Sequence, residues 1–230
     1  MSYNLDEGDS DNHYNCPVVA YYPELLMANC ERLNKQNFVF PFLDLNRKKA
    51  AIKTLTHTLQ NYASKKQVEA AFEKGMAALE AYRQEIRSQG EDIIRQARQA
   101  GKQIIVLAGR PYHIDPEINH GIHKLIASLG LAVITEDSVA HLAASPEIQA
   151  LNQWTYHARM YRAAHYVTTQ PDMQLVQLVS FGCGIDAITT DEVRRILENG
   201  GKLYTQLKID EISNLGAIKI RLRSLIAAME

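Results

Sequence analysis

Apolar runs alternate with helical stretches through the second half of the 230-residue chain, and this alternation constrains the fold most. The run KQIIVLAG (102–109) is continuous and ends in glycine, as buried parallel strands do. LAVIT (131–135), LVQLVSF (175–181) and KLYTQLKID (202–210) repeat the strand pattern, with helical stretches between them. Strands that alternate with helices favour a parallel sheet with right-handed crossovers, which is a Rossmann-like arrangement.

The first half predicts a smaller α/β segment followed by a long helix. Residues 18–22 are typical of a strand, Pro23 is placed to open a helix, and NFVFPFLDL (37–45) is typical of a second strand. Residues 47–100 contain very little Gly or Pro, and Ser64 with Gln67 forms a capping box. We therefore expect an α/β fold of two Rossmann-like parallel-sheet lobes with a helical arm between them.

This pattern divides the chain into three regions: a disordered tail over 1–15, an α/β segment with the arm over 16–100, and a Rossmann-like lobe over 101–230. Two further helix starts are predicted in the last region, at Ser145-Pro146-Glu147 and at a Thr189–Glu192 capping box. The closing helix over 213–229 carries basic residues, which are typical of a solvated face.

Charge and hydropathy exclude several classes of protein. The formal net charge is −1 at pH 7, whereas a nucleic-acid surface shows clustered positive charge. No apolar run approaches the roughly 20 residues of a membrane span. The first 15 residues are acidic and polar, unlike a secretory signal. We therefore expect a cytoplasmic protein whose three cysteines stay reduced unless a metal binds them.

Polar and glycine-rich segments follow each of the predicted strands of the second half. Because ligands of parallel α/β sheets bind at the carboxyl ends of the strands, these segments should share one ligand-binding rim. The rim residues are Arg110, Tyr112 and His113 after the first strand, Glu136, Asp137 and Ser138 after the second, Gly182, Cys183 and Gly184 after the third, and Lys208 and Asp210 after the last.

Cys183 is the cysteine whose surroundings point most clearly to chemistry. Gly182 and Gly184 let the backbone approach a bulky group, and the positive end of the following helix favours a thiolate, so Cys183 is a metal ligand or a nucleophile. Cys16 precedes Pro17 and is held extended, whereas Cys30 lies inside a predicted helix and is expected to be structural. His113 is the best functional histidine, because His120 and His123 form only an isolated i, i+3 pair.

Three common catalytic motifs are absent from the chain. There is no G-x-G-x-x-G dinucleotide fingerprint, no G-x-x-x-x-G-K-[ST] phosphate loop and no G-x-S-x-G nucleophile elbow. Dinucleotide binding, ATP hydrolysis by a phosphate loop and serine esterase chemistry of the elbow type are therefore not expected.

Several long segments resemble a known family. NCPVVAYYPELL, GRPYHIDPEINHGI, ITEDS, LVQLVSFGCGIDAITTDEV and GKLYTQLKIDEISNLGAIKIRLRSL are similar to the C-terminal part of the large acyl-CoA dehydratase activase-related proteins, also called CoA-substrate-specific enzyme activases. That part is itself similar to the subunits of 2-hydroxyglutaryl-CoA dehydratase. The resemblance covers nearly the whole chain from Cys16 onward.

The resemblance implies a redox function. It implies two Rossmann-like lobes that hold an iron–sulfur cluster of the 4Fe-4S kind, with Cys16 and Cys183 as ligands. Cys30 would be a third ligand if its helix end faced the cluster, and His113, a water or another domain could complete the site. The implied partners are an ATPase activase domain, which supplies the electron, and an acyl-CoA, which is dehydrated by a lyase system.

Two alternatives remain open at this point. The chain could be a docking module for the ATPase domain or a CoA thioester, without a cluster, or a thiol enzyme with Cys183 as its nucleophile. Related subunits pair, so a dimer contact through the helical arm is also expected.

Overall fold

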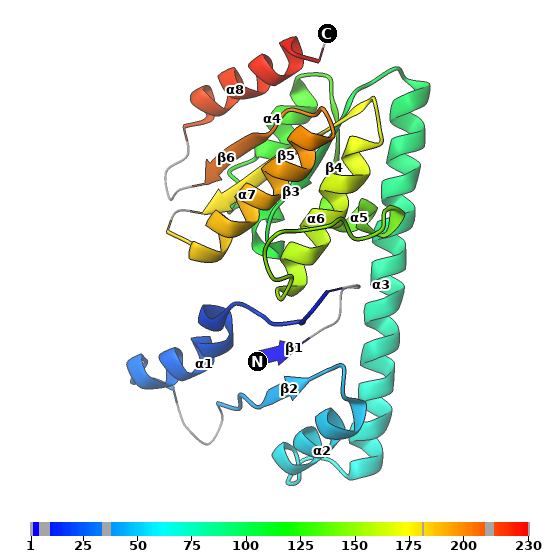
Figure 1. The fold of residues 1–230 in the computed structure, drawn as a ribbon. Coiled ribbons are helices and arrows are strands. Elements are labelled where there is room, and N and C mark those ends of the chain that lie inside the picture. Colours follow the sequence, from blue (N-terminus) through cyan, green and yellow to red (C-terminus); the bar gives the residue numbers. More distant parts are fainter. Residues whose placement is uncertain (1, 5–9, 34–37, 181, 210–213, 230) are drawn as a thin grey trace. The chain divides into compact units, whose positions relative to one another are not determined.

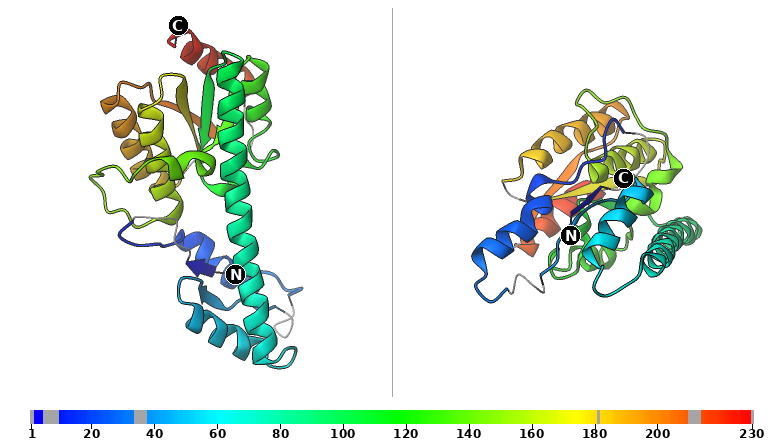
Figure 2. Two further views of the ribbon diagram at one scale, coloured as in Figure 1. Left: turned by 90° about the vertical axis from the view of Figure 1, so that its right-hand side faces the viewer. Right: turned by 90° about the horizontal axis from the view of Figure 1, so that it is seen from below.

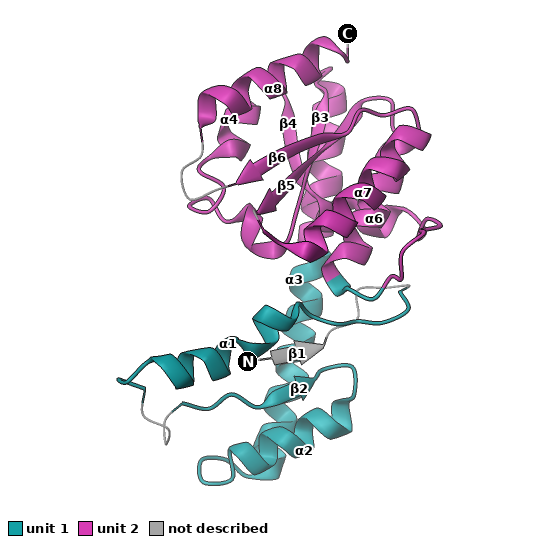
Figure 3. Cartoon of the chain, turned by 60° about the vertical axis from the view of Figure 1, so that its left-hand side comes forward, with its two compact units in different colours: residues 1–84, 153–155 teal, residues 85–152, 156–230 magenta. Residues whose placement is uncertain are grey.

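The computed structural model describes residues 2–4, 10–33, 38–180, 182–209 and 214–229 (Figure 1). The chain divides into two compact units, with unit 1 formed by residues 1–84 and 153–155 and unit 2 by 85–152 and 156–230 (Figure 3). The division falls inside one long helix, α3 (Lys65–Gln99), whereas the sequence suggested a boundary after residue 100.

Unit 2 is built on a four-stranded parallel sheet. Its strands are β3 (Ile104–Ala108), β4 (Ala132–Thr135), β5 (Met173–Ser180) and β6 (Thr205–Ile209). Their spatial order is β4-β3-β5-β6, and every neighbouring pair is parallel. The predicted α/β class with a parallel sheet is therefore confirmed.

Helices cover both faces of this sheet (Figures 1 and 2). The helices between and after the strands are α4 (Ile122–Ser128), α5 (Glu136–Val139), α6 (Thr155–Thr168), α7 (Gly184–Asn199) and α8 (Leu215–Ala227). Two short 3-10 helices, η1 (Pro111–Ile114) and η2 (Ala140–Leu142), follow β3 and α5. Asn214 caps α8 by accepting hydrogen bonds from the N–H groups of Gly216 and Ala217.

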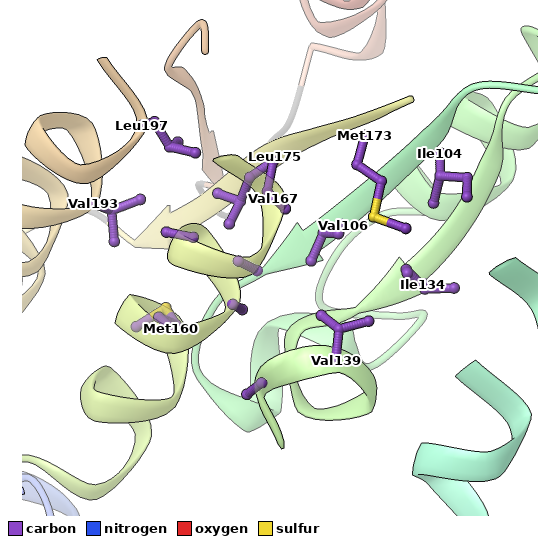
Figure 4. Packing of buried hydrophobic residues seen from close by; sticks show 14 of the residues in the cluster. Ile104, Val106, Ile134, Val139, Met160, Val167, Met173, Leu175, Val193 and Leu197 are labelled. Atoms are coloured by element: carbon purple, nitrogen blue, oxygen red, sulfur yellow. The ribbon is translucent and has the colours of Figure 1, made fainter. Parts of the chain in front are cut away.

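Two apolar cores lie on the two faces of the sheet, because successive strand side chains point to opposite sides. In the first core, Val106 and Leu175 of the sheet pack with helical side chains that include Met160 of α6 and Val193 of α7 (Figure 4). In the second core, alternate strand residues such as Ile105 pack against α4 and α8. The continuous apolar strands of the sequence reflect this burial on both faces.

Unit 1 is smaller and contains a parallel strand pair. The strands β1 (Ser2–Asn4) and β2 (Phe42–Asp44) pair in register, and the helices are α1 (Pro17–Asn29), α2 (Lys48–Thr58) and the start of α3. The described residues of unit 1 hold only these two strands, so the second Rossmann-like lobe is not confirmed. Within residues 1–15, which the sequence predicts to be a disordered tail, the described residues include β1, and Tyr14 pairs with Trp154.

The local prediction at residues 18–22 is wrong, because these residues lie in helix α1 and not in a strand. Pro17 occupies the first turn of α1, where its missing N–H costs nothing. Pro23, the predicted helix start, lies inside α1 and is its buried residue. Valine and tyrosine favour strands only weakly, and tertiary context overrides that preference.

Two predicted helix starts are also wrong. Residues 145–147 lie outside any helix, and α6 begins later, at Thr155. Thr189 is inside α7, where its hydroxyl donates to the carbonyl of Ile185 at 2.9 Å. By contrast, the predicted capping box of α3 is confirmed, since the N–H of Ser64 donates to the Gln67 side-chain oxygen at 2.9 Å.

Candidate functional site

The candidate site lies where the strand order of unit 2 reverses. From β3 the chain moves outward to β4 on one side, and β5 with β6 extends the sheet on the other side. Ligands of open α/β sheets bind in the crevice at the carboxyl ends of the strands at such a switch point. The segments that follow β3 and β5 therefore form the centre of the site.

His113 joins these two segments through a chain of hydrogen bonds. Its Nδ1 accepts the backbone N–H of Arg110 at 3.1 Å, so the neutral ring carries its proton on Nε2. That nitrogen donates to the Ser180 hydroxyl at 2.8 Å, and the Tyr112 hydroxyl lies 2.9 Å from the same oxygen. His113 is fully buried, and burial together with the Arg110 charge lowers its pKa to about 4. The ring is therefore neutral at pH 7.

Gly109 makes this arrangement possible. A Cβ at this position would lie 2.7 Å from Nδ1 of His113, closer than real side chains approach. A residue other than glycine would push the ring away from the Arg110 N–H.

A buried ion pair lies beside His113. The Arg110 guanidinium donates to Asp186 in the first turn of α7 at 2.8 Å, and the guanidinium also lies over the Tyr112 ring. Nε2 of His157, from α6, is 3.8 Å from the other carboxylate oxygen of Asp186. Burial alone would raise the pKa of Asp186, but His157 and Arg110 outweigh it and hold that pKa below its usual value. Burial lowers the pKa of His157.

A second buried ion pair lies after β4. The Arg159 guanidinium, from α6, donates to the carboxylate of Glu136 at 2.7 Å, and Glu136 is 1 % exposed. Burial raises the pKa of Glu136 to about 7, with Arg159 opposing that rise. The two ion pairs place four charged side chains at the carboxyl edge of the sheet.

Several buried polar atoms of this edge have no hydrogen-bond partner among the described residues. They are Nε of Arg110, Oε2 of Glu136 and both ring nitrogens of His157. Leaving a buried donor or acceptor unsatisfied costs about 1–3 kcal/mol. Each of these atoms therefore carries a desolvation cost that no hydrogen bond among the described residues offsets.

Cys183 lies at the N-cap of α7, with its thiol half-buried and making no capping hydrogen bond. Gly182 has a φ of +70°, a left-handed conformation that favours glycine. A Cβ on Gly182 or Gly184 would meet nothing within 4 Å, so there is open space on both sides of the cysteine. Burial raises the pKa of the Tyr112 phenol, and Cys183 is among the nearby groups that add to this rise.

Cys16 has the same helical position in unit 1 that Cys183 has in unit 2. It is the N-cap of α1, is half-buried and makes no side-chain capping bond. Cys30 is exposed at the C-cap of the same helix. A helix of 13 residues separates the two by about 20 Å at 1.5 Å per residue. Cys16 and Cys30 therefore cannot bind one cluster together.

The remaining rim residues have varied surroundings. Asp137 accepts a hydrogen bond from the hydroxyl of Thr135, and the buried Ser138 donates to the carbonyl of the same residue. Lys208 is exposed in the last strand, and Asp210 lies outside the described residues.

The fit of this chain to an iron–sulfur cluster is partial. Thiolates are the ligands of such clusters, and Cys183 has room for a bulky group. However, no group of three or more His, Cys, Asp or Glu side chains in the described residues is placed to hold a metal ion, and this includes the histidines at 120 and 123. The half-buried thiols at helix N-caps are Cys16 in unit 1 and Cys183 in unit 2.

Sequence reasoning missed four of the residues that shape the site: Ser180, Asp186, His157 and Arg159. Asp186 could have been predicted as a site residue, because it lies three residues after Cys183, in the first turn of the helix that Cys183 caps. His157 and Arg159 carry no such signal, because they meet their partners only after α6 has packed against the sheet.

Comparison with known families gives one match. A family model described as CoA enzyme activase uncharacterised domain matches residues 1–139. No curated protein and no solved structure matches the chain. Among the described residues, no helix has both the length and the apolar character needed to cross a bilayer.

Proposed function

We propose that this chain, which belongs to the family of CoA enzyme activase uncharacterised domains, binds an iron–sulfur cluster through Cys16 and Cys183 and serves in one-electron transfer. The observation that carries the proposal is the shared position of the two thiols. Each is the half-buried N-cap of a helix and makes no capping bond. A positive helix end lowers the cost of a thiolate, which is the form that binds metal.

The side chains around Cys183 suit a negatively charged group. The Arg110 guanidinium and the Tyr112 hydroxyl come from the segment after β3, and the guanidinium lies over the Tyr112 ring. Ser180 and His113 hold the Tyr112 hydroxyl in place. Hydrogen bonds and burial around the sulfurs set the potential of iron–sulfur clusters. In this proposal these residues orient the segment that carries the thiol.

Electron transfer is the chemistry that such a cluster, of the 4Fe-4S kind, supplies when bound. The proposed electron donor is an ATPase activase domain of the same or a related polypeptide. The proposed acceptor is a 2-hydroxyacyl-CoA thioester, which holds the electron only while water leaves. Because the dehydration is redox-neutral overall, the electron then returns to the protein. We place this function in the cytoplasm, where free thiols persist.

Iron and acid-labile sulfide per chain, measured after anaerobic reconstitution, test the proposal. We expect both in the wild-type protein and in Cys30→Ala, because Cys30 is remote from Cys16 along α1. We expect both to be lost in Cys16→Ala and in Cys183→Ala. An iron-free wild-type protein, or equal loss of iron in all three variants, would contradict the proposed ligands.

A second candidate is a docking module without a cluster. Helix α1 exposes Val18, Tyr21, Tyr22 and Leu25, each at least 50 % exposed, and such apolar surfaces mark interaction sites. This reading predicts that Cys183→Ala leaves binding to an ATPase activase domain unchanged, whereas Tyr21→Ser with Leu25→Ser abolishes it. Binding that survives the double substitution on α1 would exclude this helix as the docking surface.

A further inference from the structure

A basic groove runs between α2 and the first turns of α3, inside unit 1. Its volume is about 890 Å³, within the range of about 300–1,000 Å³ that small-molecule pockets cover. Its apolar part includes Ile52, which is 8 % exposed. We call this cavity the α2 groove. None of the three cysteines lines it.

Positive charge exceeds negative charge along the α2 groove. Four lysines and two glutamates line it. Lys48 forms an ion pair with Glu73, and Lys65 lies 3.6 Å from Glu69. Within the described part of the chain, Lys49 and Lys53 have no ion-pair partner. These two lysines lie four residues apart on α2, so they share one face of the helix.

The start of α2 adds to this positive charge. Lys48 and Lys49 lie in the first turn of the helix, which has no acidic residue, and the N-cap Arg47 makes no side-chain capping bond. Backbone N–H groups at a helix start already carry partial positive charge, so cations there are unfavourable and anions are favoured. An anion bound in the groove would be attracted both to these lysines and to the positive end of α2, and it would offset the repulsion between them.

Thr56 gives an independent sign of a ligand. Thr56 is one of the residues that line the α2 groove, and its hydroxyl oxygen is buried with no hydrogen-bond partner among the described residues. Buried hydroxyls are normally paired, and a phosphate oxygen is an acceptor for this one. Lysine ammonium groups bind phosphate through charge-assisted hydrogen bonds.

We propose that the α2 groove binds a phosphorylated small molecule of nucleotide size. Lys49 and Lys53 contact its phosphates, Thr56 donates a hydrogen bond to one of them, and its less polar part lies against Ile52. A free nucleotide and the nucleotide end of coenzyme A share this chemistry. No cysteine is among the residues that line the groove, so the proposal does not rest on the proposed cluster.

Isothermal titration of the full chain with coenzyme A, ATP and pantetheine tests the proposal. We expect coenzyme A, ATP or both to bind, and pantetheine, which lacks the nucleotide, to bind much more weakly. Added salt should weaken the binding, since it screens exposed charges. Binding of coenzyme A without ATP identifies the coenzyme as the source, and binding of both identifies a general nucleotide site.

The variants Lys49→Gln with Lys53→Gln, and Thr56→Val, assign the binding to this groove. We expect the lysine pair to weaken binding by about tenfold, since charge-assisted contacts are the stronger ones. The matched control is Lys66→Gln with Lys74→Gln, which removes the same charge from exposed positions of α3 outside the groove. Equal weakening by the two lysine pairs would overturn the assignment.

Further outcomes would also overturn it. These are no binding of either nucleotide-bearing probe, or binding of an acidic peptide in their place. Circular dichroism of each variant shows whether unit 1 remains folded, and Thr56→Val gives a second readout if the lysine pair unfolds. Repeating the titration with Cys16→Ala and Cys183→Ala protein separates this proposal from the cluster, because we expect unchanged nucleotide binding there.

Discussion

His113 should make the free energy of unfolding depend on pH, because burial keeps its ring neutral in the folded protein. Its pKa is about 4 in the folded protein, against an ordinary value of 6.5. Between these values the unfolded chain binds a proton that the folded protein does not. The free energy of unfolding must therefore fall as the pH falls from about 6.5 to about 4.

We predict that His113→Gln removes this part of the pH dependence. The contribution lost by the wild type between pH 7 and 4 is up to about 3 kcal/mol. Urea unfolding of both proteins at several pH values measures it. The raised pKa of Glu136 acts in the opposite direction, because its proton stabilises the folded state as the pH falls from about 7.

The difference between the two proteins isolates His113, since Glu136 and His157 are present in both. Parallel pH profiles for wild type and variant would mean that the ring is already protonated, or accessible to water, in the folded protein.

At the scale of the element, α3 has glycines in two different surroundings. A Cβ on Gly90 would lie 2.5 Å from Cβ of Ser138, so the helix contacts α5 at a position where only glycine fits. A Cβ on Gly75 would meet nothing within 4 Å. Replacing glycine by alanine should therefore change the stability of the protein in opposite directions at Gly90 and Gly75.

We predict that Gly90→Ala destabilises the protein by about 1–3 kcal/mol, because the added methyl group overpacks the contact with α5. Gly75→Ala should stabilise α3 by up to about 1 kcal/mol, since alanine is the better helix former. Urea unfolding followed by circular dichroism measures both changes. Stabilisation by Gly90→Ala would show that α3 does not pack against Ser138.

At the scale of the whole molecule, the two units differ in how much apolar surface they bury. Unit 2 has an apolar core on each face of its sheet. In the described residues of unit 1, the buried apolar side chains are Leu43, Ala51, Ile52 and Val68, together with Pro23 of α1. Local opening is easiest where few apolar contacts must be broken.

Amide hydrogen exchange should therefore separate the units. We predict that amides of β3 and β5 exchange at least about 100-fold more slowly than those of α1, because the central strands open only with global unfolding. Mass spectrometry of peptic fragments of the full chain measures this ratio. Comparable protection of α1 and β3 would mean that α1 belongs to a stable core.

The predictions that succeeded rest on short-range patterns. The strands of unit 2 were recognisable because burial on both faces requires continuous apolar runs. The start of α3 was recognisable because Ser64 and Gln67 satisfy each other's backbone groups within one turn. The predictions that failed, at residues 18–22, at residues 145–147 and at Thr189, rested on local residue preferences that tertiary packing overrides.

The sequence by itself determined the α/β class of unit 2, the long α3 helix and the helix-start position of Cys183 after a strand, because each depends on neighbours along the chain. Only the tertiary structure decided which strands lie side by side and which buried charges meet. Arg110 and Asp186 are 76 residues apart, yet they pair at 2.8 Å because β3 and β5 are neighbours. Strand order is a property of long-range packing, and no local pattern encodes it.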